Sequence, residues 1–201
     1  MRRLQVRPIR LCATVVLLVT NALLGAPNLS NAQAIKPDKS DDLPALVVFV
    51  RHGDVSLDIR GDPPLIPAGI KRSHDLASAL RNAAFTAIVT TQFMRTRDTA
   101  KPIADALGLV PEVVAYVPPQ REAHTEAMVN AVRKHKGGVV LIVGHTNTLP
   151  PIIAALGGPR VPVICDTVFD NLFFLFRSTD KIHFAHARYG AASAIPGPDC
   201  H

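Results

Sequence analysis

The chain has 201 residues and a formal net charge of +6, and 48% of its residues are hydrophobic. This length and apolar content suit a single domain that buries most of its unfolded surface. No run of lysine and arginine with interleaved aromatic residues is present, so nucleic acid is excluded as an expected partner.

The first 34 residues have the features of an export signal. Four arginines and no acidic residue open the segment, an apolar run covers residues 11–24, and the segment ends in Ala32-Gln33-Ala34, a small-x-small pattern. The apolar run is shorter than the roughly 20 residues that a membrane-spanning helix needs. We therefore predict cleavage after Ala34, a periplasmic or secreted protein, and no membrane span after cleavage.

The basicity of the chain is mostly a property of this segment. Loss of its four arginines would lower the formal net charge from +6 to +2. Residues 35–44 are polar and contain two prolines, and we expect a flexible lead-in there, followed by one domain over residues 45–201. Cys165 and Cys200 would remain after cleavage. An oxidising compartment permits a disulfide between them, but the sequence leaves this pairing open.

Strand and helix patterns alternate along residues 45–201. The runs 45–50 and 139–143 are uniformly apolar and rich in β-branched residues, which is typical of strands buried on both faces. This alternation favours a three-layer α/β/α fold around a largely parallel sheet. Further strands are expected at 86–90, 112–117, 171–176 and 182–187, the last two as a hairpin, and helices from 68 onward, over 93–107, 121–135 and 149–156.

Two of these helices carry more specific predictions. The first is expected to bury a stripe of Ile70, Leu76, Ala79 and Leu80. The second should end at Gly108, because glycine commonly ends helices, and Pro102 inside it should kink or split it.

Polar segments follow three of the expected strands, at residues 51–53, 90–97 and 144–147. Parallel α/β sheets bind ligands at the carboxyl ends of their strands, so these segments should meet. Together they supply two imidazoles, two or three guanidinium groups, and several hydroxyl and amide groups. One guanidinium group can bind two phosphate oxygens at once, and a neutral imidazole can attack phosphorus. This set of groups therefore suits a phosphate dianion.

The order of these segments resembles the histidine phosphatase superfamily, which has the phosphoglycerate mutase-like fold. Val50-Arg51-His52-Gly53 matches the hallmark Arg-His-Gly that follows the first strand of that family. Residues 91–100 are similar to its small-x-x-x-Arg-x-x-x-Thr-Ala segment, and Val143-Gly144-His145-Thr146 is similar to its second histidine motif. The resemblance extends over residues 45–189.

The resemblance implies a role for each matching residue, with no metal ion and no cofactor. His52 would be the nucleophile, forming a phosphohistidine that water hydrolyses. Arg51 and Arg95 would hold the phosphoryl oxygens, and His145 would stabilise the charge of the transferring group. The remaining expected phosphate contacts are Gly53, whose backbone can approach closely, and Thr146.

Two geometric conditions limit these roles. Neighbours on a regular strand point to opposite faces, so Arg51 and His52 can share a pocket only if the chain leaves strand geometry there. Arg97 is two positions after Arg95, about 200° around a helix, and is expected to face solvent or pair with an acid.

The proton donor to the leaving group is the least determined residue, because an alkoxide leaving group needs a general acid. Relatives of the mutase-like branch place a glutamate after the third strand, where Glu122 stands here; a carboxylate there could also simply complement the helix dipole. The phytase-like branch has an aspartate after its second histidine, where this chain has Thr146. Asp54 and Asp166 are alternatives to Glu122. The other histidines, His124 among them, lack metal-ligand spacing and are expected to be structural.

The expected function is a phosphomonoesterase that acts on a small phosphorylated substrate by way of a phosphohistidine. The short opening Arg51-His52-Gly53-Asp54 resembles the small phosphohistidine phosphatases of the family. Two alternatives stay open: a phosphate-binding module of the same fold without turnover, and a phosphoglycerate mutase-type phosphotransferase, which fits poorly with an export signal. Neither the substrate nor the oligomeric state can be read from the sequence.

Overall fold

The computed structural model describes residues 43–178 and 181–194, which form one six-stranded mixed sheet with helices on both faces. The expected export signal and Cys200 lie outside these residues. The sheet has the strand order β3-β2-β4-β1-β5-β6. Strands β3, β2, β4 and β1 pair in parallel, and β5 pairs antiparallel with both β1 and β6. The strands are β1 (Leu46–Arg51), β2 (Ala87–Thr90), β3 (Glu112–Val113), β4 (Val139–Gly144), β5 (Asn171–Arg177) and β6 (Ile182–Arg188).

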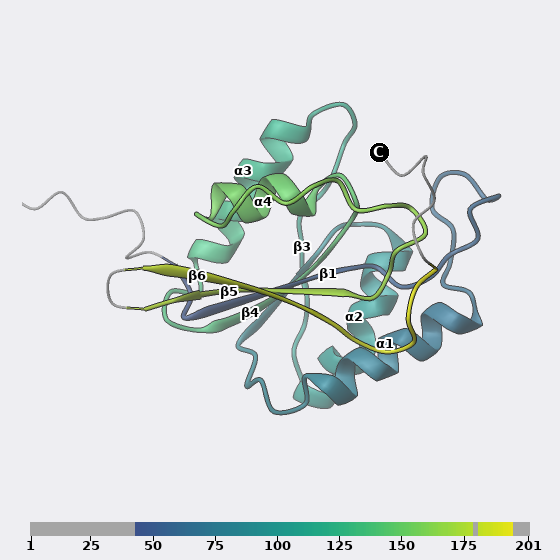
Figure 1. The fold of residues 1–201 in the computed structure, drawn as a ribbon, viewed down its shortest axis with the longest axis horizontal. Coiled ribbons are helices and arrows are strands. Elements are labelled where there is room, and N and C mark those ends of the chain that lie inside the picture. The colour runs from purple at the N-terminus through teal and green to yellow at the C-terminus, as the bar shows by residue number, and fades with distance from the viewer. Residues whose placement is uncertain (1–42, 179–180, 195–201) are drawn as a thin grey trace, which may run out of the picture. The chain divides into compact units, whose positions relative to one another are not determined.

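Among the described residues, helices α1 to α4 complete the three layers (Figure 1). Helices α3 and α4 cover one face of the sheet, and α1 and α2 cover the other. This arrangement is the three-layer α/β/α fold that the sequence predicted. The helices are α1 (Pro67–Ala79), α2 (Met94–Leu107), α3 (Arg121–Arg133) and α4 (Leu149–Ala155).

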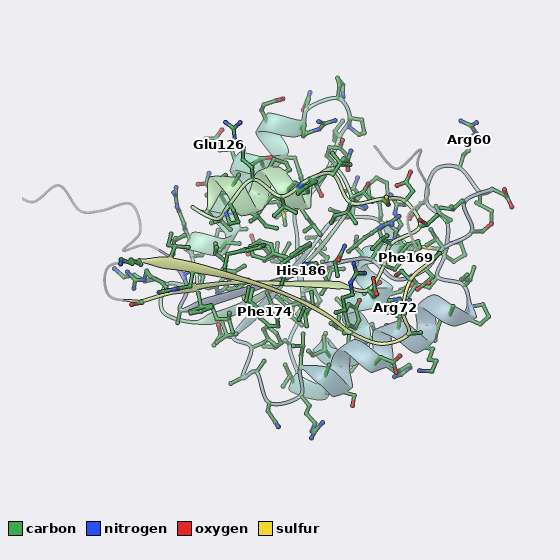
Figure 2. The ribbon with its side chains drawn as sticks, viewed as in Figure 1. Arg60, Arg72, Glu126, Phe169, Phe174 and His186 are labelled. Carbon is green, nitrogen blue, oxygen red and sulfur yellow. The ribbon has the colours of Figure 1, made fainter. Side chains whose placement is uncertain are left out.

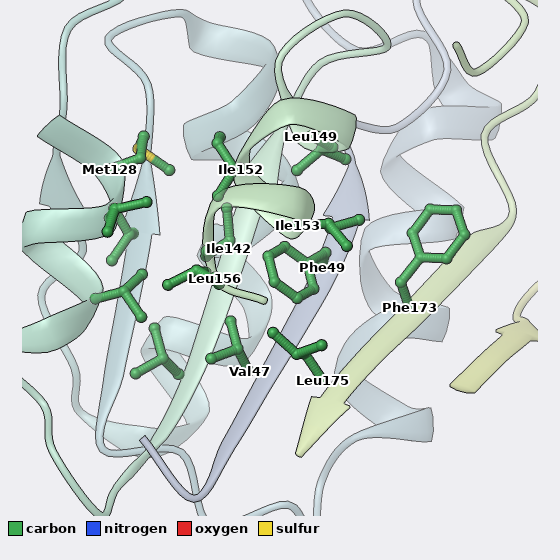
Figure 3. Close-up of a cluster of buried hydrophobic side chains, with 14 of the residues drawn as sticks. Val47, Phe49, Met128, Ile142, Leu149, Ile152, Ile153, Leu156, Phe173 and Leu175 are labelled. Carbon is green, nitrogen blue, oxygen red and sulfur yellow. The ribbon is translucent and has the colours of Figure 1, made fainter. Parts of the chain in front are cut away.

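The two central strands, β1 and β4, are almost fully buried because each has helices above and below it. Alternate residues of β1 supply different cores: Phe49 packs under α3 and α4, and Val48 packs toward α1 and α2. Figure 3 shows the first of these cores, in which Phe49 and Ile142 lie among side chains of α4. The predicted burial of these strands on both faces is confirmed.

The structure corrects parts of three local expectations. Strand β3 is two residues long, not six, because pairing with β2 involves only Glu112 and Val113. Helix α2 is continuous through Pro102 and is not split there; it ends at Gly108 as predicted, with a φ of 65° that glycine readily adopts. In the stripe predicted for the first helix, Leu76 and Leu80 are buried, but Ile70 and Ala79 are exposed.

The packed domain also begins before residue 45. Leu43 is buried, and its carbonyl accepts a hydrogen bond from the Gly137 amide at 3.3 Å. No helix within the described residues is long and apolar enough to cross a membrane.

Candidate active site

The register of β1 and β4 brings the two motif histidines together. Arg51 pairs with Gly144, so the residues that follow, His52 and His145, emerge side by side at the carboxyl edge of the sheet. The His52 amide donates to the Gly144 carbonyl at 3.0 Å, and the two imidazole rings lie 5.3 Å apart between centroids. Strand β1 ends at Arg51, so the chain leaves strand geometry where the sequence required it to.

The His52 imidazole is oriented by its own loop. Its Nδ1 lies 2.9 Å from the Gly53 carbonyl, an acceptor only, so Nδ1 carries the proton and Nε2 has the lone pair. Burial lowers the pKa of His52 well below 6.5, the Arg51 charge lowers it further, and the Gly53 carbonyl opposes both. His52 is therefore neutral at neutral pH, as a nitrogen nucleophile must be.

The Arg51 guanidinium is fixed by hydrogen bonds at Nη1, whereas its Nε–Nη2 edge makes no hydrogen bond in the described structure and has only an ion pair of 3.8 Å from Nη2 to Asp166. Its Nη1 donates to the carbonyls of Cys165, Asp166 and Val168 at 2.9, 2.8 and 3.0 Å, and the group lies 4.0 Å over the Phe169 ring. Its Nε is buried and has no hydrogen-bond partner in the described structure. Burial lowers the pKa of Arg51 to about 10, so the group is still a cation at neutral pH.

The second cation, Arg95, comes from the first turn of α2. Its Nη1 donates to the Gly61 carbonyl at 3.1 Å and to Asp62 at 3.3 Å, and the guanidinium lies 4.3 Å over the Phe93 ring. Burial lowers the pKa of Arg95, and the Asp62 carboxylate opposes this shift. Arg97 is exposed, as expected from its position on the helix.

His145 is almost fully buried against side chains of the β2–α2 segment. Its Nε2 lies 3.0 Å from the Thr91 hydroxyl, and its ring centroid is 5.3 Å from that of Phe93. Burial lowers its pKa to about 3, with Arg95, His124 and Arg51 each adding a repulsion between like charges. Binding of an anion would relieve that repulsion, since opposite charges favour the protonated ring.

Gly53 has a structural reason to be glycine. A Cβ there would lie 2.9 Å from the Gly69 carbonyl oxygen of α1, which is backbone and cannot move aside. The Gly53 amide donates to the Thr99 hydroxyl at 2.8 Å, so this amide is engaged within the protein. The absence of a side chain at Gly53 thus allows a close approach between helix α1 and the loop that carries His52, whereas the sequence predicted a close approach of this backbone to phosphate. Thr146, the other predicted phosphate contact, lies half-buried in the turn after His145.

Glu122 makes no hydrogen bond or ion pair with the two motif histidines in the described structure. It is exposed in the first turn of α3 and lines a groove between α3 and α4 together with Glu126 and Pro151. Figure 2 shows Glu126 on the outer side of α3. None of the residues that line this groove belongs to the histidine and arginine cluster.

The two alternative acids are nearer the cluster but differently engaged. Asp54 accepts hydrogen bonds from the buried Arg72 guanidinium, at 2.6 Å from Nε and 3.4 Å from Nη2. The side chain of Asp166 is 77% exposed, and its carboxylate lies 3.8 Å from Arg51 Nη2.

Several residues of the site were missed from the sequence. Phe169 lies beneath Arg51 and beside His52, with a ring separation of 6.1 Å, and Tyr116 lies beside His145 at 6.2 Å. Both belong to irregular segments without a motif, so only a tertiary contact reveals them. Thr91, by contrast, stands inside the segment that the resemblance rested on, and its position directly after β2 was available as a signal.

Two further features bear on chemistry. Across residues 43–178 and 181–194, no group of three or more histidine, cysteine, aspartate or glutamate side chains is arranged to hold a metal ion. Cys165 is disulfide-bonded. Whether its partner is Cys200, which the sequence left open, is not tested, because Cys200 is not among the described residues.

The fold and the cluster together define an α/β protein with an imidazole and guanidinium site at the carboxyl edge of its sheet. Residues 47–116 match the family model "Histidine phosphatase superfamily (branch 1)". This match includes Arg51, His52 and Arg95 and confirms the resemblance that the motifs predicted; His145 lies beyond it.

A curated sequence is also similar to part of this chain. Over 69 residues the chain is 39% identical to "Probable phosphoglycerate mutase GpmB" of Yersinia pestis (strain Pestoides F). The aligned segment covers 31% of this chain and 32% of that protein. The chain thus spans about a third of the length of the curated relatives that it matches.

Two solved structures share the fold. The protein histidine phosphatase SixA complexed with tungstate has a TM-score of 0.54 at 18% identity, covering 71% of this chain and 96% of SixA. A mycobacterial glucosyl-3-phosphoglycerate phosphatase has a TM-score of 0.53 at 16% identity, covering 74% and 99% of the two chains. At these identities the likeness concerns the fold alone.

Proposed function

We propose that this chain is a phosphomonoesterase that transfers the phosphoryl group of its substrate to His52 and then to water. The observation that carries the proposal is the Nε–Nη2 edge of Arg51, which makes no hydrogen bond within the described residues although Nη2 lies 3.8 Å from the exposed Asp166 carboxylate. Its Nη1 is anchored to three carbonyls, while its buried Nε has no partner in the described part of the chain. An unpaired buried donor is costly, and two oxygens of a phosphoryl group would satisfy Nε and Nη2 together.

The neighbouring groups suit both steps of the reaction. His52 Nε2 attacks phosphorus, and the ester oxygen leaves; water then attacks the phosphohistidine and releases inorganic phosphate. Arg51, Arg95 and a protonated His145 would neutralise the charge on the phosphoryl oxygens. The phosphatase and mutase names of the similar proteins are consistent with transfer to a histidine.

The test is hydrolysis of p-nitrophenyl phosphate by the purified protein, together with trapping of an acid-labile phosphoenzyme. His52→Ala should abolish both product and phosphoenzyme. His74→Ala, a change at an exposed histidine of α1, should leave both unchanged. Product release by His52→Ala at the wild-type rate would refute the proposal.

The same assay separates the two alternatives. A phosphate-binding module without turnover would bind tungstate and release no product. A phosphotransferase of the mutase type would form the phosphoenzyme but pass the group to a second phosphorylated acid faster than to water.

The proposal includes action outside the cytoplasm, which is supported by the order of basic, apolar and small-residue zones in residues 1–34. The N-terminal sequence of protein recovered from the producing cell tests this. A mature chain that begins at Ile35 supports export, and a retained N-terminus contradicts cleavage.

A further inference from the structure

The proposed phosphatase reaction lacks an obvious acid. An alkyl phosphate expels an alkoxide, and protonation by a positioned side chain typically accelerates such a step by about 100-fold or more. The three carboxylates considered from the sequence are poorly placed for this: Glu122 lies in another groove, Asp54 is bound to Arg72, and Asp166 is largely exposed. A fourth, Asp62, is bound to Arg95 and to the Met94 amide.

Tyr116 is held rigidly next to His145. Its backbone is bonded on both sides by one side chain, because Gln92 donates to the Tyr116 carbonyl at 2.9 Å and accepts from the Tyr116 amide at 2.8 Å. Its ring lies near two imidazoles, with centroids 5.0 Å from His124 and 6.2 Å from His145. With 9% of its surface exposed, the residue is nearly buried.

The Tyr116 hydroxyl has a proton to give. The Asn147 amide donates to the phenol oxygen at 3.3 Å, from the turn that follows His145. A phenol oxygen both accepts and donates, and this bond uses only its accepting side. Among the described residues no acceptor takes the phenol proton. The same amide would stabilise the phenolate that remains after the proton has left.

We propose that Tyr116, oriented by Asn147, donates the proton that the leaving group of the substrate needs. This proposal rests on the proposed phosphatase function and adds a catalytic residue to it. In the first step the bond from His52 Nε2 to phosphorus forms, the bond from phosphorus to the ester oxygen breaks, and the phenol proton moves to that oxygen. In the second step water attacks phosphorus, the bond to His52 breaks, and a proton of the water returns to the phenolate.

The test compares two substrates with two isosteric variants. Tyr116→Phe keeps the ring beside His124 and His145 and removes only the hydroxyl. Tyr189→Phe is the matched control, since the Tyr189 hydroxyl is buried without a hydrogen-bond partner among the described residues and lies near α1. One substrate, p-nitrophenyl phosphate, has a good leaving group, and the other, glycerol phosphate, has a poor one.

Tyr116→Phe should lower kcat/KM for glycerol phosphate by about 100-fold and for p-nitrophenyl phosphate far less. Tyr189→Phe should change neither. If Tyr116 had only a structural role, Tyr116→Phe would lower kcat/KM equally for both substrates, and that result overturns the proposal. So does a Tyr116→Phe enzyme with full activity on glycerol phosphate, or a wild-type enzyme that hydrolyses only p-nitrophenyl phosphate.

Two controls keep the outcome interpretable. If Tyr116→Phe does not fold, Asn147→Ala leaves the phenol in place without its orienting amide, and it should produce the same selective loss on glycerol phosphate; an equal loss on both substrates counts against the proposal. Failure of the phosphatase function itself looks different, because the wild-type protein would then hydrolyse neither substrate.

Discussion

The Nε2 atom of His145 lies 3.0 Å from the hydroxyl oxygen of Thr91, and the neighbouring contacts determine which of the two donates. The Thr96 hydroxyl has one proton and lies 2.8 Å from the Phe93 carbonyl and 3.1 Å from the Thr91 carbonyl, so it donates to a carbonyl. In its 2.9 Å contact with Thr96, the Thr91 hydroxyl must then be the donor. The Thr91 oxygen therefore accepts from a protonated Nε2, and the lone pair of neutral His145 is on Nδ1.

Thr91→Val should therefore lower the activity without creating a cavity in the core. The variant keeps the shape of the side chain but leaves the Nε2 proton of His145 without its acceptor, so the ring loses its fixed orientation. We expect kcat/KM for p-nitrophenyl phosphate to fall by up to about 100-fold, the typical effect of misplacing a reacting group by an ångström. Nitrogen NMR of the His145 ring should show the tautomer changing or averaging.

The neighbouring Thr90→Val is the control for this experiment. Thr90 is equally buried, but its hydroxyl has no hydrogen-bond partner within the described chain. The change should therefore leave activity intact and keep or raise the free energy of unfolding. Equal activity losses in the two variants would mean that Thr91 acts only through packing.

Arg51→Lys should weaken oxyanion binding although it preserves the charge. The ammonium group of lysine cannot donate to the carbonyls of Cys165, Asp166 and Val168 and also present two adjacent N–H donors to phosphate. We expect a lower affinity for tungstate and a free energy of unfolding reduced by about 1–3 kcal/mol, because buried carbonyls lose their donor. Arg97→Lys on the exposed face of α2 is the matched control. Calorimetric titration with tungstate measures the effect, and an unchanged affinity would contradict the role of the Arg51 edge.

The sequence predicted the fold well where burial and chain order determine it. The uniformly apolar runs at β1 and β4 could only be central strands, and the glycine and histidine after each one marked the edge at which His52 and His145 meet. Short elements were predicted less well. Strand β3 ends after Val113, because its length depends on pairing with β2, which leaves no local pattern.

The proposed acid, Tyr116, has no signal in the local sequence. Glu122 was chosen by its position after the third strand, but the rotation of α3 turns it outward and places His124, two residues later, toward Tyr116. Tyr116 itself has neither motif nor periodicity, and its place beside His145 depends on the tertiary bonds from Gln92. In an irregular segment, tertiary packing determines the direction of a side chain, and the local sequence does not.

The buried histidines should make the protein lose stability in acid. Burial lowers the pKa of His52 well below 6.5 and that of His145 to about 3, whereas both would titrate near 6.5 in the unfolded chain. Between about pH 6.5 and pH 3 the unfolded state binds more protons than the native state, so stability falls as the pH falls through this window and levels off above it.

Thermal unfolding from pH 7.5 to pH 4 measures this loss. At the same concentration, tungstate should raise Tm more at pH 5 than at pH 7.5. The reason is that a bound dianion favours the protonated form of the buried imidazoles. His145→Asn removes one of the buried imidazoles and should flatten the dependence of Tm on pH, while His74→Asn, at an exposed position, should not. His124 has a pKa lowered by burial as well, so the slope should shrink in His145→Asn without vanishing. An acid slope identical in His145→Asn and wild type would show that His145 is not held neutral in the native protein.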